Sequence, residues 1–221
     1  MRYAIALVLA AERRYVGPTS RTVIEIRDET PDDYPAIREL NERAFGGPAE
    51  ARLVDMLRAA NKAVISLVAL DQNRVVGHIL FSPITVAEAP GNFRGVGLAP
   101  MSVLPEFQNR GIGSRLVREG LEACKREGYA VVVVLGHANY YPRFGFSRAK
   151  DYGLDNEYDA TDEFMVIELQ EGILTGLRGL VKYAPEFRDA TIGSKRTAEK
   201  RGRLVAGRSA SQGRAMASAL L

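Results

Sequence analysis

The sequence predicts an α+β (mixed α/β) fold, in which helices flank one central, mixed but mostly antiparallel sheet. Two observations support this fold class. Two long runs of β-branched and apolar residues, at 63–70 and 74–86, are separated by Asp-Gln-Asn and indicate a hairpin of antiparallel strands. Further along, a strand, a helix and a second strand follow one another, and such a crossover joins two parallel strands.

The first elements are a short strand and two helices. Residues 23–26 alternate in the manner of a β-strand. Thr30 can then cap a helix that starts at Pro31, because proline suits the first helical position and the acidic residues after it favour the positive end of the helix dipole. Glycines at 46–47 end this helix, and residues 49–60 form the second one.

The strand-helix-strand unit follows the hairpin. Residues 94–104 form its first strand, and because Pro100 cannot donate a ladder hydrogen bond, a bulge or an unpaired stretch is expected there. Residues 112–127 carry apolar side chains at helical spacing, and residues 129–135, with four consecutive valines, are typical of a buried strand. A right-handed crossover then puts the end of the first strand, 101–104, beside the second.

At 221 residues the chain is long enough for one well-buried domain with extensions, and too short for two large ones. The domain is expected to span residues 22–189, with its core at 22–170. Further strand signals lie at 146–148, 164–169 and 180–183.

The two ends of the chain differ from the domain in composition. Residues 1–21 are expected to form a poorly ordered extension, because their apolar run is short for a secretion signal. Residues 190–221 form a basic tail that is expected to be disordered. This tail holds seven basic residues and one acidic residue, which leaves 23 basic and 26 acidic residues elsewhere. The domain is therefore mildly acidic, and nucleic acid is not expected as its partner.

Composition also argues against several other classes of protein. No apolar run approaches the roughly 20 residues that cross a bilayer, so no membrane partner and a cytoplasmic location are expected. Cys124 is the only cysteine and the chain has two histidines, His78 and His137, which are too few for a disulfide framework or a zinc site rich in these ligands. No metal is therefore expected, and His78, on a strand, is expected to be structural.

The segment at 103–114 carries the clearest chemical signal, because it leads from a strand through a tight loop into a helix. Gly111 and Gly113 lack a Cβ atom, so their backbone N–H groups can approach an anion closely, and the helix start supplies unpaired donors and a positive dipole end. Arg110 adds a full charge. A Rossmann loop is disfavoured because Leu116 stands at its third glycine, and the Gly-Lys-Ser/Thr of a P-loop is absent.

This segment resembles the acetyl-CoA pyrophosphate loop of the GNAT superfamily of N-acetyltransferases. The matching pattern is Gln108-x-x-Gly111-x-Gly113, preceded by the run APMSVLP at 99–105. The resemblance covers residues 23–169 and is closest to the bacterial YhbS-like branch, through the runs AFGG at 44–47, VGHI at 76–79 and YYPRFGF at 140–146.

The resemblance implies the GNAT fold, in which the two parallel strands splay apart and pantetheine pairs with the first strand as a substitute strand. It implies acetyl-CoA as the co-substrate. Asn139 could also reach this cofactor, although a helix cap is an equal alternative. The residues placed along pantetheine are Met101, Ser102 and Val103, and those whose backbone surrounds the pyrophosphate are Gln108, Asn109, Arg110, Gly111, Ile112, Gly113 and Ser114.

The resemblance also implies a catalytic acid. Tyr141 stands four residues before Gly145, the spacing at which GNAT enzymes place the tyrosine that protonates the departing thiolate. A phenol with a pKa of about 10 stays protonated at neutral pH and can donate to the sulfur of CoA. The structural alternative is that Tyr140 or Tyr141 only packs a short helix against the sheet.

A base for the incoming ammonium is not singled out, because Glu50, Asp55, Glu106 and His137 are all plausible by position. The resulting hypothesis is an N-acetyltransferase that moves an acetyl group from acetyl-CoA to a primary amine by direct attack in a ternary complex. The acceptor, a small molecule or a peptide, stays open, as does a homodimer. The alternative is a non-catalytic acyl-CoA sensor or interaction module of the same fold.

Overall fold

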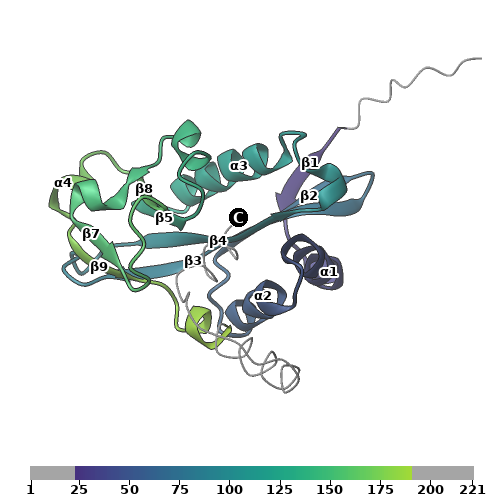
Figure 1. Ribbon diagram of the computed structural model, residues 1–221, viewed down its shortest axis with the longest axis horizontal. Coiled ribbons are helices and arrows are strands. Elements are labelled where there is room, and N and C mark those ends of the chain that lie inside the picture. The colour runs from purple at the N-terminus through teal and green to yellow at the C-terminus, as the bar shows by residue number, and fades with distance from the viewer. Residues whose placement is uncertain (1–22, 191–221) are drawn as a thin grey trace, which may run out of the picture.

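The computed structural model describes residues 23–190, which form one mixed sheet with helices on both faces (Figure 1). The extension expected at residues 1–21 and the tail expected at 190–221 lie outside this part, apart from Ala190, which is buried. Along the sheet the strands are ordered β1-β2-β3-β4-β5-β8-β6, and β9 joins β7 to β3. None of the described helices is long and apolar enough to cross a membrane.

The first half of the described chain builds one edge of the sheet and the helices of one face. Its elements are β1 (Glu25–Asp28), the 3-10 turn η1 (Pro31–Asp33), α1 (Tyr34–Phe45), α2 (Ala49–Ala59), β2 (Ile65–Asp71) and β3 (Arg74–Val86). The second half holds β4 (Gly95–Val103), η2 (Pro105–Phe107), α3 (Ile112–Arg126), β5 (Val131–Leu135), η3 (Tyr141–Phe144), β6 (Ser147–Arg148), η4 (Ala149–Tyr152), β7 (Leu154–Asn156), β8 (Phe164–Glu168), α4 (Ile173–Gly176) and β9 (Gly179–Lys182).

The predicted fold class is confirmed. Every strand pairing is antiparallel except β4 with β5 and the small pair β7 with β9. The first helix begins one turn later than expected, because Pro31 opens the 3-10 turn η1 and the α-helix starts at Tyr34. The short elements β7 and α4 were not expected from the sequence.

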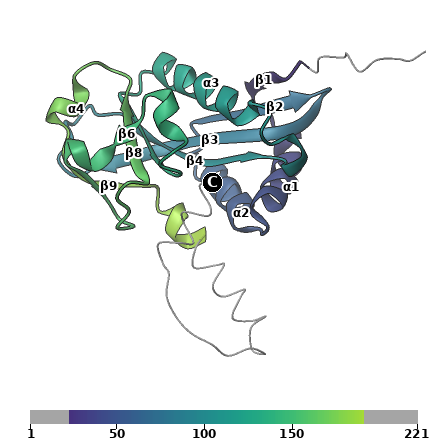
Figure 2. The same ribbon diagram turned by 45° about the horizontal axis from the view of Figure 1, so that its top comes forward.

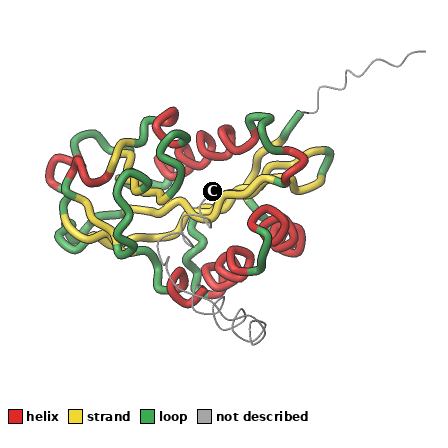
Figure 3. The backbone as a smooth tube through the Cα atoms, viewed as in Figure 1, coloured by secondary structure: helices red, strands yellow, loops and turns green. Residues whose placement is uncertain are grey.

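The layers are clear also when the molecule is turned, because α3 covers one face of the sheet while α1 and α2 cover the other (Figure 2). Figure 3 shows the helices on both sides of the strands. Under α3 the packing is close. A Cβ atom at Gly120 would lie 2.5 Å from the ring of Phe81, so only glycine lets this helix approach β3 so closely. On the opposite face, Ile37 of α1 and Leu57 of α2 are fully buried.

The position of the parallel pairing corrects one expectation. β4 pairs with β5 from Gly95 opposite Val131 to Leu98 opposite Val134. The end of β4, residues 101–103, pairs only with β3 on its other side, so residues 101–104 do not lie beside 131–135 as predicted. The two parallel strands are therefore joined at one end and separated beyond Leu98.

A β-bulge at Pro100 explains this change, and it confirms the irregularity predicted there. The register of β3 with β4 shifts between Ile79 and Phe81, so that Ala99 and Pro100 together oppose Leu80. The extra residue also exchanges the two faces of the strand. Leu98 packs on the α3 side and Ala99 on the opposite side, and after the bulge it is Met101 that packs on the α3 side.

Candidate active site

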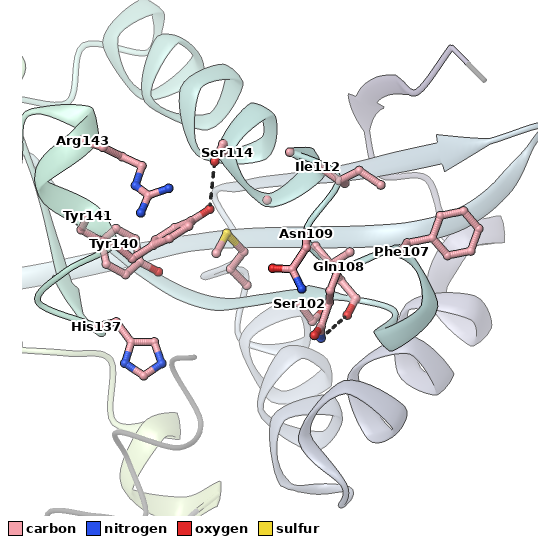
Figure 4. A pocket seen from close by; sticks show the side chains of 14 residues that line it. Ser102, Phe107, Gln108, Asn109, Ile112, Ser114, His137, Tyr140, Tyr141 and Arg143 are labelled. Carbon is pink, nitrogen blue, oxygen red and sulfur yellow. Dashed lines mark hydrogen bonds between the residues drawn. The ribbon is translucent and has the colours of Figure 1, made fainter. Parts of the chain in front are cut away.

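A cavity of about 450 Å³ opens where β4 and β5 separate, between the start of α3 and the turn that follows β5 (Figure 4). Three segments line it: the end of β4, the loop into α3, and residues 137–143. The lining residues are Met101, Ser102, Val103, Phe107, Gln108, Asn109, Gly111, Ile112, Gly113, Ser114, His137, Tyr140, Tyr141 and Arg143.

Ten of the twelve residues that the sequence suggested for the site line this one cavity. Arg110 and Asn139 are not among its lining residues. The guanidinium of Arg110 lies 5.0 Å from the ring centroid of Phe107, and the backbone carbonyl of Asn139 accepts a 3.4 Å hydrogen bond from Arg143. Phe107 and Arg143 were not foreseen as lining residues, although both lie in segments that the sequence singled out, because only the folded loops bring their side chains to the cavity.

The loop before α3 has backbone amides without acceptors in the described chain and two residues in the left-handed region. Gly111, the N-cap, has a φ of +80° and Asn109 a φ of +59°, both in the left-handed region. The carbonyl of Gly111 already accepts the amide of Arg115 at 3.0 Å. The amides of residues 109–114 donate to no acceptor within residues 23–190. Unpaired amides at the positive end of a helix, here one of 15 residues, are an arrangement that favours anions.

The second glycine of the loop has a different role from the first. A Cβ atom at Gly111 would meet nothing within 4 Å, whereas one at Gly113 would lie 3.1 Å from the hydroxyl oxygen of Tyr140. That hydroxyl also lies 3.4 Å from Oγ of Ser114 (Figure 4). The space left at Gly113 is therefore filled by Tyr140, which holds the turn after β5 against the start of α3.

Two hydrogen bonds fix the floor of the cavity. The side-chain amide of Gln108 donates to the carbonyl of Val103 at 3.1 Å, which ties the loop to the end of β4. On the other face, the buried hydroxyl of Ser102 donates to Oδ1 of Asn41 at 3.1 Å. Asn41 in turn donates to the carbonyl of Ile37 within α1 at 2.8 Å. The open end of β4 is therefore anchored to α1.

Tyr141 lies in the wall of the cavity with only 2% of its surface exposed. Its ring packs edge-on against Tyr140, with centroids 5.1 Å apart, and against Phe146 at 5.6 Å. Its hydroxyl has no hydrogen-bond partner in the described part of the chain. Burial, and to a lesser degree Tyr140, raise the pKa of Tyr141 above that of an ordinary phenol, so this hydroxyl keeps its proton and is available as a donor.

His78 lies away from the cavity, in a buried polar cluster. Its Nε2 lies 2.9 Å from Oγ of Ser66 and 3.5 Å from Oε2 of Glu29, which also accepts two hydrogen bonds from Arg58. Burial lowers the pKa of His78. These contacts agree with the structural role expected for this residue.

Comparison with known proteins identifies the family. A family model described as an acetyltransferase (GNAT) domain matches residues 25–149. The chain belongs to this family. GNAT relatives in the YhbS branch are similar over most of the domain: the uncharacterized N-acetyltransferase YhbS of Escherichia coli is 38% identical over 164 residues, which cover 73% of this chain and 97% of that protein.

Solved GNAT structures give the same result. The structure of Escherichia coli YhbS in complex with CoA has a TM-score of 0.71 at 38% identity, over 75% of this chain and 92% of that one. A GNAT acetyltransferase of Brucella melitensis in complex with acetyl-CoA has a TM-score of 0.63 at 36% identity, over 75% and 99% of the two chains. The GNAT fold and the YhbS-like branch inferred from the sequence are both confirmed.

Proposed function

We propose that this protein is an N-acetyltransferase that moves an acetyl group from acetyl-CoA to a primary amine by direct attack in a ternary complex. The single observation that carries the proposal is the set of unpaired amides at residues 109–114, in the loop that lines the cavity at the positive end of α3. A diphosphate is the part of CoA that such amides bind best. The structures of Escherichia coli YhbS with CoA and of the Brucella melitensis acetyltransferase with acetyl-CoA support this assignment.

The remaining parts of the cofactor follow from the shape of the cavity. Beyond Leu98 the edge of β4 that faces β5 has no strand beside it, so the backbone of residues 101–103 can pair with the amide groups of pantetheine. Pantetheine in this position directs the thioester toward Tyr141. Arg143, which also lines the cavity, adds positive charge for the phosphates.

Acetyl transfer then needs few protein groups. A neutral amine attacks the thioester carbonyl, a backbone N–H near Val103 stabilises the oxyanion, and Tyr141 protonates the sulfur as the C–S bond breaks. Cys124 does not offer an acyl-enzyme route, because it is fully buried and burial raises the pKa of its thiol to about 12. These features favour direct attack.

The test is the release of free thiol from acetyl-CoA in the presence of a panel of primary amines, with mass spectrometry to identify acetylated products. Thiol release that depends on the amine supports the enzyme, provided that the product is about 42 Da heavier than the amine, as expected when acetyl replaces one hydrogen. Tight binding of acetyl-CoA without thiol release over a wide panel would instead support the sensor or interaction module.

A further inference from the structure

We propose that His137 is the base that takes the proton from the acceptor ammonium, an inference that rests on the proposed function. The need for a base is chemical, because a primary amine is largely protonated at neutral pH and an ammonium has no lone pair with which to attack. Two observations point to this residue: His137 lines the cavity, and the three other candidate bases are either held in ion pairs or lie outside it.

The backbone fixes His137 at the mouth of the gap between the parallel strands. The amide of Gly136 donates to the carbonyl of Glu163 at 2.9 Å, and the carbonyl of His137 accepts the amide of Tyr140 at 2.9 Å. The first bond ties the residue before His137 to the chain that enters β8, and the second ties His137 itself to the turn that follows β5. Its exposed imidazole lies at the end of the cavity remote from Phe107, below Tyr140 and Tyr141 (Figure 4).

This position is on the acceptor side of the thioester. Gln108 and Asn109 of the loop lie toward one end of the cavity, and Tyr141, the proposed acid, lies with His137 toward the other (Figure 4). A cofactor whose phosphates lie at Asn109 and whose sulfur lies at Tyr141 leaves the region beside His137 for the amine. The imidazole can reach the nitrogen there directly or through one water molecule.

The three other candidates are placed differently. Asp55 is paired with Arg38 and lies 3.4 Å from Arg58. Glu106 is held at 3.1 Å by both Arg43 and Arg74. A carboxylate held between two arginines is a poor proton acceptor, since protonation would break both ion pairs.

Glu50 is half-buried at the start of α2, where burial raises the pKa of its carboxyl group. It does not line the cavity that holds Tyr141. It is nevertheless the best matched rival to His137, because no side chain of residues 23–190 forms an ion pair with it.

The charges that face His137 leave it as the group suited to exchange protons. Within the described residues the cavity is lined by no carboxylate, and its other ionisable side chains are Tyr140, Tyr141 and Arg143. Arginine stays charged at any relevant pH, and Tyr141 is a donor by virtue of its burial. Histidine is the side chain that enzymes use most often to accept or donate a proton in a reaction.

The neighbouring elements bring further charges, of which those of Glu186 and Arg188 are paired. Glu163 precedes β8 beside the end of β5. In the helical turn at residues 186–190, Glu186 binds Lys62 at 2.8 Å and Arg188 lies 3.8 Å from Glu157. Asp189 of the same turn carries one more negative charge. The surroundings of the imidazole are therefore mixed in sign.

The protons balance as follows. The ammonium gives one proton to the imidazole, and the neutral nitrogen then forms the C–N bond while the C–S bond breaks. The sulfur takes the proton of Tyr141, and the second proton lost by the nitrogen returns to Tyr141 through solvent. The imidazolium releases its proton to water, so that each turnover yields one amide, one thiol and one free proton.

The experiment measures kcat/KM for a primary amine against pH in the intact wild-type protein, in His137→Gln and in Glu50→Gln. At neutral pH we expect His137→Gln to lower kcat/KM about tenfold to a thousandfold, with the KM for acetyl-CoA changed less than about threefold. As the pH approaches the pKa of the amine, solution supplies neutral acceptor and most of this loss should disappear. Glu50→Gln should follow the wild-type profile.

A merely structural role for His137 would lower the rate by the same factor at every pH, and that result would overturn the proposal. So would a wild-type profile for His137→Gln, or a pH-dependent loss in Glu50→Gln instead. Added imidazole should raise the rate of His137→Ala but leave that of Tyr141→Phe unchanged. If the wild-type protein acetylates no amine in the same assay, the proposed function fails and this inference fails with it. If the wild-type protein is active but His137→Gln keeps the wild-type pH profile, only the role of His137 fails.

Discussion

The two halves of β4 belong to one strand but have different surroundings. Residues 95–98 are paired on both edges, with β3 and with β5, and they are fully buried. Residues 101–103 are paired with β3 alone, and their other edge faces the cavity. An unpaired edge of this kind normally invites aggregation, so a fold that keeps one inside the molecule reserves it for a ligand.

This comparison separates stability from function along one strand. Changes around the open half should alter turnover or cofactor affinity and leave the fold intact. Changes in the closed half should lower the free energy of unfolding and leave the folded molecules active. The following variants test that separation, beginning with the largest expected effect.

Tyr141→Phe, in the wall of the cavity that the open half also lines, should lower kcat about tenfold to several hundredfold with the affinity for acetyl-CoA little changed. Its stability should not fall, because the hydroxyl that is removed is buried and has no partner in the described chain. Tyr183→Phe is the matched control, since its hydroxyl is also buried without a partner there but lies outside the cavity. Steady-state rates and thermal unfolding check both variants. An unaltered kcat for Tyr141→Phe would remove it from the mechanism.

Gly111→Glu should weaken acetyl-CoA binding at least about tenfold, because it puts a negative charge beside the amides proposed to bind the phosphates. Gly111→Ala separates charge from backbone strain. It places a Cβ atom at a φ of +80° where nothing lies within 4 Å, so it should cost about 1 kcal/mol of stability and much less affinity. Calorimetric titration measures the affinities, and normal binding by Gly111→Glu would refute the loop assignment.

Gly97→Val addresses the closed half of β4. A Cβ atom there would lie 2.4 Å from the ring of Tyr183, so the substitution should destabilise the protein by about 1–3 kcal/mol. Denaturant unfolding measures this loss, and the KM for acetyl-CoA of the folded fraction should be unchanged. Gly91→Ala, at a site with no atom within 4 Å, is the neutral control. A large change in KM for Gly97→Val would contradict the division of the strand.

Ser102→Ala should give the smallest effect. It should lower the free energy of unfolding by about 1 kcal/mol, because it leaves Oδ1 of the buried Asn41 without its donor. Since Ser102 belongs to the open half, we also expect a change of a few-fold in the KM for acetyl-CoA. A double-mutant cycle with Asn41→Ala should show that the two losses are not additive. Additive losses would mean that the two side chains are not coupled.

The sequence predicted the elements with strong local signals and failed where distant strands had to be aligned. The bounds of β3 were predicted in full, because a turn and two apolar runs fix a hairpin locally. The register of β4 on β5 could not be predicted, because a parallel pair has no short turn to set it and the bulge at Pro100 exchanges the faces of the strand. Elements of three or four residues, such as β7 and α4, are too short to show a period.

The part of the site that could be predicted from the sequence is the part that lies within one continuous family motif. The loop from Gln108 to Ser114 is continuous in sequence, so its resemblance to GNAT proteins carried the positions directly. The contact of Gly113 with Tyr140 was not foreseen. The hydroxyl of Tyr140 lies close to where a Cβ atom of residue 113 would be, and Tyr140 is 27 residues further along the chain. Likewise, four candidate bases stayed open until the ion pairs of Asp55 and Glu106 were known.

The contact of Tyr140 with the start of α3 has one more consequence. Tyr140 and Tyr141 are adjacent, so the first residue of the pair rests on the helix end that we propose for the phosphates while the second offers its proton some distance away. Because one peptide bond joins the two residues, we expect the position of the Tyr141 hydroxyl to depend on how α3 begins. Under the proposed function, binding of the diphosphate and placement of the thioester would then be coupled through the contact of Tyr140 with α3.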